Sequence, residues 1–138
     1  MPSDIDAIAS RFRAALDAAD WPAVTALLDP ACVYHFRGGR MTGAEEIVGS
    51  YRTIDEWVRT TFDAVRYESS HEVESDAAAL IAFRDLIDHG EHHLDHRCRQ
   101  RIEIDTSGRV CSITHIDIEG EPEKAARFNE ACGVVKPG

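Results

Sequence analysis

The sequence has little positive charge for its length. Its 138 residues include 15 Lys and Arg against 25 Asp and Glu, so its formal net charge is −10 with neutral histidines. Nucleic acids and anionic lipid surfaces attract basic patches, and their binding is dominated by that charge. We therefore expect neither nucleic acid nor a membrane as a partner.

Long apolar runs and paired cysteines are also missing. No run approaches the ~18 apolar residues of a membrane span, and the N-terminus lacks the basic and apolar regions of a secretory leader. The cysteines, Cys32, Cys98, Cys111 and Cys132, lie far apart and form no CxxC pair, so nothing indicates a disulfide framework or an oxidising compartment. We expect a soluble, cytoplasmic protein with free thiols.

Apolar periodicity predicts helices in the first half of the chain and strands in the second half. The length suits one domain over residues 1–138, without repeats or linkers. Five elements are predicted before residue 64. They are a helix ending near Ala19, a short helix that starts at Asp20–Pro22 and stops before Pro30, a strand over Cys32–Phe36, a turn over residues 37–40 with Gly38 and Gly39, and a helix that opens at Thr42 or Gly43 and includes Phe62.

Four strand candidates follow in succession, over residues 65–73, 77–88, 92–105 and 109–119. Turn residues join them, so we expect consecutive antiparallel pairing. Pro122 then begins a short C-terminal helix, and Gly133 stands where its end is expected. Helices first and long strands afterwards predict an α+β fold, with the helices on one face of a curved sheet.

Besides the order of elements, several residues along the chain indicate a resemblance to a known family. They are Phe12, Asp20-Trp21, Leu27-Leu28-Asp29, Val33-Tyr34-His35, Gly43 and Ile47, followed by the four strands. Together they resemble the nuclear transport factor 2-like superfamily, particularly its SnoaL-like and ketosteroid-isomerase-like members. The resemblance implies a cone-shaped, curved antiparallel sheet wrapped around N-terminal helices, a small-molecule pocket at the open end and a homodimer formed through the sheet.

The segment from His92 to Asp105 shows best where a pocket would lie. Its odd-numbered residues are all ionisable, so that face of the predicted strand meets water. Its even-numbered residues begin as core at Ile104 and Ile102 and then turn polar at Gln100, Cys98 and His96. A face that changes in this way is typical of a strand whose far part lines a ligand cavity.

A pairing register follows if the turn over residues 105–108 closes Ile104 onto Arg109. It places His96 opposite Asp117, Cys98 opposite His115 and Gln100 opposite Ile113. If Ile87 pairs with Leu94 across the preceding turn, Asp85 also lies opposite His96. Side chains in such a row lie ~5 Å apart at Cβ, close enough for hydrogen bonds. We predict His96 and His115 as proton-transfer residues, with Asp85 and Asp117 orienting them.

Two observations favour other interpretations of this row. Histidine and aspartate near a strand turn commonly form a surface pair. In the last strand, simple hydrophobicity would also turn Val110, Ile116 and Ile118 inward, which would push His115 and Asp117 outward. If the predicted register holds, the isoleucines face a dimer partner or a covering segment instead.

The residues that carry activity in the resembled families match only in part. Ketosteroid isomerases use a tyrosine in the first helix, a protonated aspartate and an aspartate base, where this sequence has Phe12, Gln100 and Phe36. The isomerase mechanism is therefore not implied, although Gln100 can donate to a carbonyl oxygen. Dehydratase relatives use an aspartate that Asp17 matches, but their histidine position falls near Phe62. Asp17 is otherwise interpreted as a solvated helix residue.

Further residues are candidates for the pocket wall or for other chemistry. Cys98 beside His115 suits a thiolate pair or, more simply, a small buried hydrophobe. Two histidines with Asp85 or Asp117 would resemble a metal site, although we predict no metal and no cofactor. The candidates for ligand contact are Tyr34, Phe36, Trp57, Phe83, Cys98, Gln100, Phe12 and Asp17.

Taken together, these observations predict a protein with a pocket that binds a small, oxygenated, partly apolar compound. As an enzyme it would be a cofactor-free isomerase, cyclase or lyase that uses His/Asp acid-base chemistry. The alternatives are a ligand-binding or dimeric interaction module without turnover and a metal-dependent site.

Overall fold

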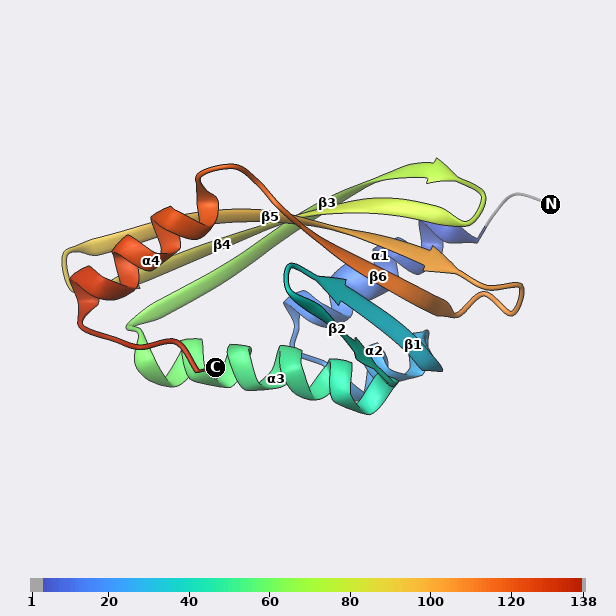
Figure 1. The fold of residues 1–138 in the computed structure, drawn as a ribbon, viewed down its shortest axis with the longest axis horizontal. Coiled ribbons are helices and arrows are strands. Elements are labelled where there is room, and N and C mark those ends of the chain that lie inside the picture. The colour runs from blue at the N-terminus through green and yellow to red at the C-terminus, as the bar shows by residue number, and fades with distance from the viewer. Residues whose placement is uncertain (1–3, 138) are drawn as a thin grey trace.

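The computed structural model describes residues 4–137 as four helices and one six-stranded sheet (Figure 1). The elements are α1 Ile5–Asp17, α2 Trp21–Leu27, β1 Leu28–Phe36, β2 Gly39–Thr42, α3 Ala44–Thr61, β3 Ala64–Ser75, β4 Ala78–His89, β5 His92–Ile104, β6 Val110–Asp117 and α4 Glu121–Cys132. The predicted α+β layout of N-terminal helices, long strands and a C-terminal helix is confirmed. No helix among the described residues is both long and apolar enough to cross a bilayer.

The sheet has the strand order β2-β1-β6-β5-β4-β3 and is curved and open. The strands β3 to β6 pair antiparallel in succession, as predicted. The sheet is mixed rather than wholly antiparallel, because β1 runs parallel to β6. β2 was not predicted: only Arg37 and Gly38 form the turn, and the chain from Gly39 then pairs back onto β1.

The pairing of β5 with β6 differs from the predicted register by two residues. Cys98 lies opposite Asp117 and Gln100 opposite His115, so His96 is not opposite Asp117. One residue of this shift arises at the turn, because Ile104 pairs with Val110 instead of Arg109. The other arises from a bulge at Cys111, since Glu103 pairs with Ser112. A shift of two residues preserves the face of every side chain, because strand side chains alternate with period two. The predicted pairings of Asp85 with His96 and of Ile87 with Leu94 are correct.

Two apolar clusters lie between the helices and the concave face of the sheet. The larger cluster joins α1 and α3 to β4, β5 and β6 and includes Phe12, Ile47, Ile81 and Ile102, none of which is exposed. The smaller cluster joins the end of α3 to α4 through Val58, Phe62 and Phe128. Val110 belongs to the larger cluster, contrary to its predicted outward position, because the bulge at Cys111 turns it inward.

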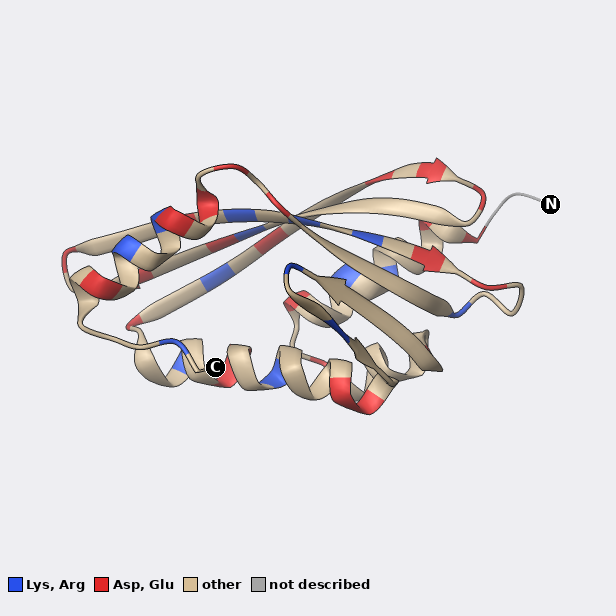
Figure 2. Ribbon diagram, viewed as in Figure 1, with Lys and Arg blue, Asp and Glu red and all other residues tan. Residues whose placement is uncertain are grey.

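Charged residues of both signs are distributed along β3, β4 and β5 (Figure 2). On the convex face, Arg84 Nη2 lies 2.8 Å from Asp95 Oδ2, and Arg101 Nε lies 2.6 Å from Glu74 Oε1. The odd-numbered residues of β5 therefore face water, as their alternation predicts. The even-numbered residues face the helices.

Candidate functional site

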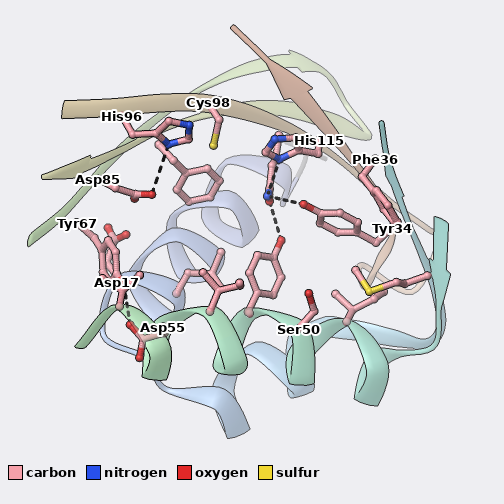
Figure 3. A pocket seen from close by; sticks show the side chains of 18 of the residues that line it. Asp17, Tyr34, Phe36, Ser50, Asp55, Tyr67, Asp85, His96, Cys98 and His115 are labelled. Atoms are coloured by element: carbon pink, nitrogen blue, oxygen red, sulfur yellow. Dashed lines mark hydrogen bonds and ion pairs between the residues drawn. The ribbon is translucent and has the colours of Figure 1, made fainter. Parts of the chain in front are cut away.

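A cavity of about 540 Å³ lies between α1, α2 and α3 and the polar part of the concave face (Figure 3). Nine of the residues predicted for a site line it. They are Asp17, Tyr34, Phe36, Phe83, Asp85, His96, Cys98, Gln100 and His115. The change from apolar to polar along the even-numbered face of β5 therefore marks the cavity, and both histidines lie on its wall.

Three predicted residues are placed elsewhere. Phe12 is fully buried in the larger apolar cluster, where it packs as core. Trp57 packs edge-on against Phe62 at a centroid distance of 5.3 Å, in the smaller cluster. Asp117 is not part of the cavity wall, but it forms a hydrogen bond with His115, which is. Helical spacing alone does not distinguish a residue on the cavity wall from a neighbour one turn away in the core.

A hydrogen-bond network centred on Gln100 forms one end of the cavity. Gln100 is only 4% exposed. Its Oε1 accepts from the Tyr51 hydroxyl at 2.6 Å, and its Nε2 donates to the Tyr34 hydroxyl at 3.1 Å. Burial raises the pKa of both tyrosines well above the ordinary value, so both phenols keep their protons at neutral pH. Because Tyr34 accepts from Gln100, its own O–H is available to a ligand oxygen.

His115 lies beside this network and is oriented by Asp117. Its Nε2 lies 3.0 Å from Asp117 Oδ1 and its Nδ1 lies 3.5 Å from Gln100 Nε2, so the bond to Asp117 is the stronger. The ring also stacks on Tyr34, with centroids 6.5 Å apart and planes 29° apart. This arrangement leaves Nδ1 facing the cavity with only a weak protein contact.

His96 forms a second imidazole–carboxylate pair, next to the other end of the cavity. Its Nδ1 lies 3.7 Å from Asp85 Oδ2, close enough for an ion pair but too far for a strong hydrogen bond. The two residues are directly opposite on β5 and β4, as the sequence predicts. No other polar contact of the His96 ring exists within residues 4–137, so Nε2 is available to a ligand.

That other end of the cavity is acidic and includes residues that sequence reasoning missed. Asp55, which is 8% exposed, accepts at Oδ1 from the Tyr67 hydroxyl at 2.8 Å and from Arg59 Nε at 2.9 Å. Asp17 accepts at Oδ2 from the Ser69 hydroxyl at 2.7 Å. Burial raises the pKa of Asp17, and the charge of Asp85 acts in the same direction. The predicted cavity residue Asp17 is therefore more than a solvated helix residue.

A sequence signal for Asp55 exists in hindsight. The face of α3 toward the cavity consists of Ile47, Ser50, Tyr51, Ile54, Asp55 and Val58. These residues follow the helical spacing of i, i+3, i+4, i+7, i+8 and i+11. A carboxylate on a largely apolar, inward helix face is costly unless it is paired, so Asp55 indicates a polar contact.

Cys98 lies on the cavity wall beside the two imidazoles. Burial raises the pKa of its thiol to about 12, with the charges of Asp85 and Asp117 adding to the effect. Because the thiolate is the nucleophilic form, the thiol is inert near neutral pH. Cys98 therefore acts as a small apolar wall residue, and the thiolate interpretation is not supported.

The remaining wall is apolar except at Ser50 and at the C-terminal segment. Its apolar residues include Leu16, Trp21, Met41, Ile54 and Val58. Gly133 ends α4 in the left-handed region, at φ 70°, and the chain then runs back toward α3 (Figure 1). Lys136 and Pro137 reach the cavity. The cavity combines an apolar middle with two different polar ends.

The described residues do not support the alternative of a metal site. Among residues 4–137, no three His, Cys, Asp or Glu side chains are grouped so that they could hold a metal ion. The register explains why, since His115 lies opposite Gln100 instead of Cys98. The two histidines are thus one strand repeat further apart than predicted, and each has its own carboxylate.

Comparisons with known proteins find similarity in structure but not in sequence. No family model matches the sequence, and no curated protein is similar enough in sequence to count as a relative. Bal32a, from a soil-derived mobile gene cassette, has a TM-score of 0.72 and 22% identity, covering 89% of this chain and 94% of that one. An LEH-like epoxide hydrolase of M. tuberculosis has a TM-score of 0.63 and 21% identity, covering 90% of each chain.

A candidate polyketide cyclase from Pseudomonas putida KT2440 is similar in the same way. Its TM-score is 0.63 at 16% identity, and the match covers 85% of this chain and 94% of that one. At such identities the likeness shows the fold alone, and it confirms the predicted fold.

Proposed function

We propose that this chain, which has the nuclear transport factor 2-like fold of those structures, binds a small oxygenated compound and moves protons on it. The proposed reaction is an isomerisation, cyclisation or elimination beside a carbonyl group, without a cofactor. The observation that carries the proposal is that two imidazoles, each oriented by a carboxylate, line one cavity of about 540 Å³. Epoxide hydrolase and cyclase names among the neighbours support small-molecule chemistry in this fold.

The roles follow from which atoms are available. His96 Nε2 and His115 Nδ1 are the candidates to take or give a proton at the ligand. Asp85 and Asp117 lie behind them and stabilise the imidazolium formed when the ring takes a proton. The Tyr34 hydroxyl, polarised by Gln100, donates to the carbonyl oxygen on which negative charge develops.

The test follows a single proton transfer rather than a particular pathway. A panel of cyclic ketones in D₂O, followed by ¹H NMR, measures exchange of the protons beside the carbonyl. His96→Ala or His115→Ala should lower the exchange rate by roughly 10²- to 10⁴-fold. His93→Ala is the control, because His93 is exposed and pairs with Asp88 on the hairpin.

Each outcome is informative. Exchange that is unchanged in both cavity variants contradicts the proposed roles. Ligands that bind without any exchange would instead identify the chain as a binding module, for which the Tyr34–Gln100–Tyr51 network is equally suited.

We also propose a homodimer through the convex face of the sheet. Leu80 and Leu86 of β4, Ile116 of β6 and the following Ile118 are only partly buried there. A partner covering them would remove apolar surface from water. Sedimentation analysis should give twice the chain mass, and Ile116→Glu should give the monomer mass. A wild-type protein that sediments as a monomer contradicts this proposal.

A further inference from the structure

The acidic end of the cavity contains more negative charge than the protein neutralises. Asp55 is paired with Arg59 at 2.9 Å. Among residues 4–137, neither Asp17 nor Asp85 forms an ion pair with a lysine or arginine, and Asp85 has only His96 at 3.7 Å. Arg13, on the same helix as Asp17, binds the Ser69 carbonyl and His71; its charge acts on Asp17 and favours the carboxylate, but within the described chain it forms no ion pair with it.

Each of these two carboxylates keeps one oxygen without a protein partner. Asp17 uses Oδ2 for the Ser69 hydroxyl, and Asp85 directs Oδ2 toward His96. The Oδ1 atoms accept no hydrogen bond from the described part of the chain, although both residues line the cavity. Half-buried carboxylate oxygens gain most from a charged donor, and charge-assisted hydrogen bonds are the strong ones.

The shape of this end favours an organic cation over a metal ion. The carboxylates of the described chain are not grouped closely enough to share a metal. Tyr67 lies directly opposite Asp85 on β3, but the Arg59 guanidinium already covers one face of its ring at 5.4 Å from the centroid. The rings of Phe83 and Trp21 also line the cavity. Aromatic faces near carboxylates suit an ammonium group attached to an apolar body, because ring faces attract cations.

We propose that the ligand of this cavity has a protonated amine at one end, held by Asp17 and Asp85, and an oxygen function at the other end, held by Tyr34. The inference rests on the proposed function, since it names the ligand class of the same cavity. The apolar middle of the wall would contact the body of the ligand. The cavity would therefore discriminate between an amine and a neutral compound of the same shape.

Lys136 also lines the cavity and carries a positive charge. Within residues 4–137 it forms no ion pair with a carboxylate. Its charge opposes a bound ammonium group. Removing it should therefore strengthen amine binding, whereas removing a carboxylate should weaken it. These opposite directions separate an electrostatic effect from general damage to the cavity.

The experiment uses two probes that differ at one group. They are 4-(2-aminoethyl)acetophenone and 4-(2-hydroxyethyl)acetophenone, which share a ring and a carbonyl group, and NMR titration gives both dissociation constants. We expect the amine to bind on the order of tenfold to a hundredfold more tightly, as a charge-assisted hydrogen bond implies. Asp17→Asn and Asp85→Asn should each reduce that preference, and Lys136→Gln should increase it.

Glu123→Gln is the matched control, because it removes one negative charge from an exposed position of α4 outside the cavity. Its preference should equal that of the wild-type protein. Equal binding of the two probes overturns the amine inference while supporting a small-molecule cavity. Failure of both probes to bind at millimolar concentration, with ketone exchange also absent, contradicts the proposed function as well.

Discussion

The bond between Tyr51 and Gln100 allows a quantitative test of the cavity's polar end. It is 2.6 Å long, and Gln100 is 4% exposed. Tyr51→Phe leaves Gln100 Oε1 without its donor, and an unsatisfied buried acceptor costs roughly 1–3 kcal/mol. Gln100→Leu leaves the hydroxyls of Tyr51 and Tyr34 without their partner and should cost about as much.

The double variant Tyr51→Phe/Gln100→Leu removes both ends of that bond, so no unsatisfied partner remains between them. Its loss of unfolding free energy should be smaller than the sum of the single losses by roughly 1 kcal/mol or more. Urea unfolding of the four proteins measures this difference. As a control, Tyr51→Phe combined with Leu94→Ala should be additive, because Leu94 belongs to the other apolar cluster. Additivity in the Tyr51–Gln100 cycle would refute the assigned network.

Two further predictions concern pKa values. Burial raises the pKa of Cys98 to about 12 from the ordinary 9.0, so its thiolate population at pH 8 is lower by roughly a thousandfold. Iodoacetamide should therefore leave Cys98 unmodified in the folded protein and label it in urea, which mass spectrometry measures. Rapid labelling of Cys98 in the folded protein would disprove the raised pKa. Burial also raises the pKa of Asp17 above 3.8, so its stabilising contribution is complete below that value and is lost as the pH rises through the folded-state pKa. Asp17→Asn should therefore lose less stability than the wild-type protein between pH 3.5 and pH 7 in urea unfolding, and equal losses would contradict the raised pKa.

The sequence predicts the elements well because their signals are local. Helical and strand periodicities give the order of elements, and the Asp85–His96 pairing follows from one tight turn. The β5–β6 register was wrong by two residues. The turn closes Ile104 onto Val110 instead of Arg109, and the bulge at Cys111, which adds the second residue, has no sequence signal as clear as a glycine or proline. The inward position of His115 was nevertheless correct, since a shift of two residues does not change the face.

The limits of sequence reasoning are clearest for residues whose role depends on packing. Phe12 and Phe83 are both apolar aromatics on inward faces, but only Phe83 reaches the cavity. Whether such a residue packs in the core or lines the cavity depends on the distance between the helices and the sheet at that point. No local sequence pattern encodes that distance. The contacts of Tyr67 and Asp55 join β3 to α3 across 12 residues and needed the assembled fold.

The reversal of the chain after Gly133 has a practical consequence. Because Lys136 and Pro137 line the cavity, a purification tag joined at the C-terminal end would follow the cavity wall closely and compete with small compounds. The first residues of α1 lie about 18 Å from Asp17, at 1.5 Å per helical residue. Extensions placed before α1, on the far side of the molecule, would keep the cavity clear for screening.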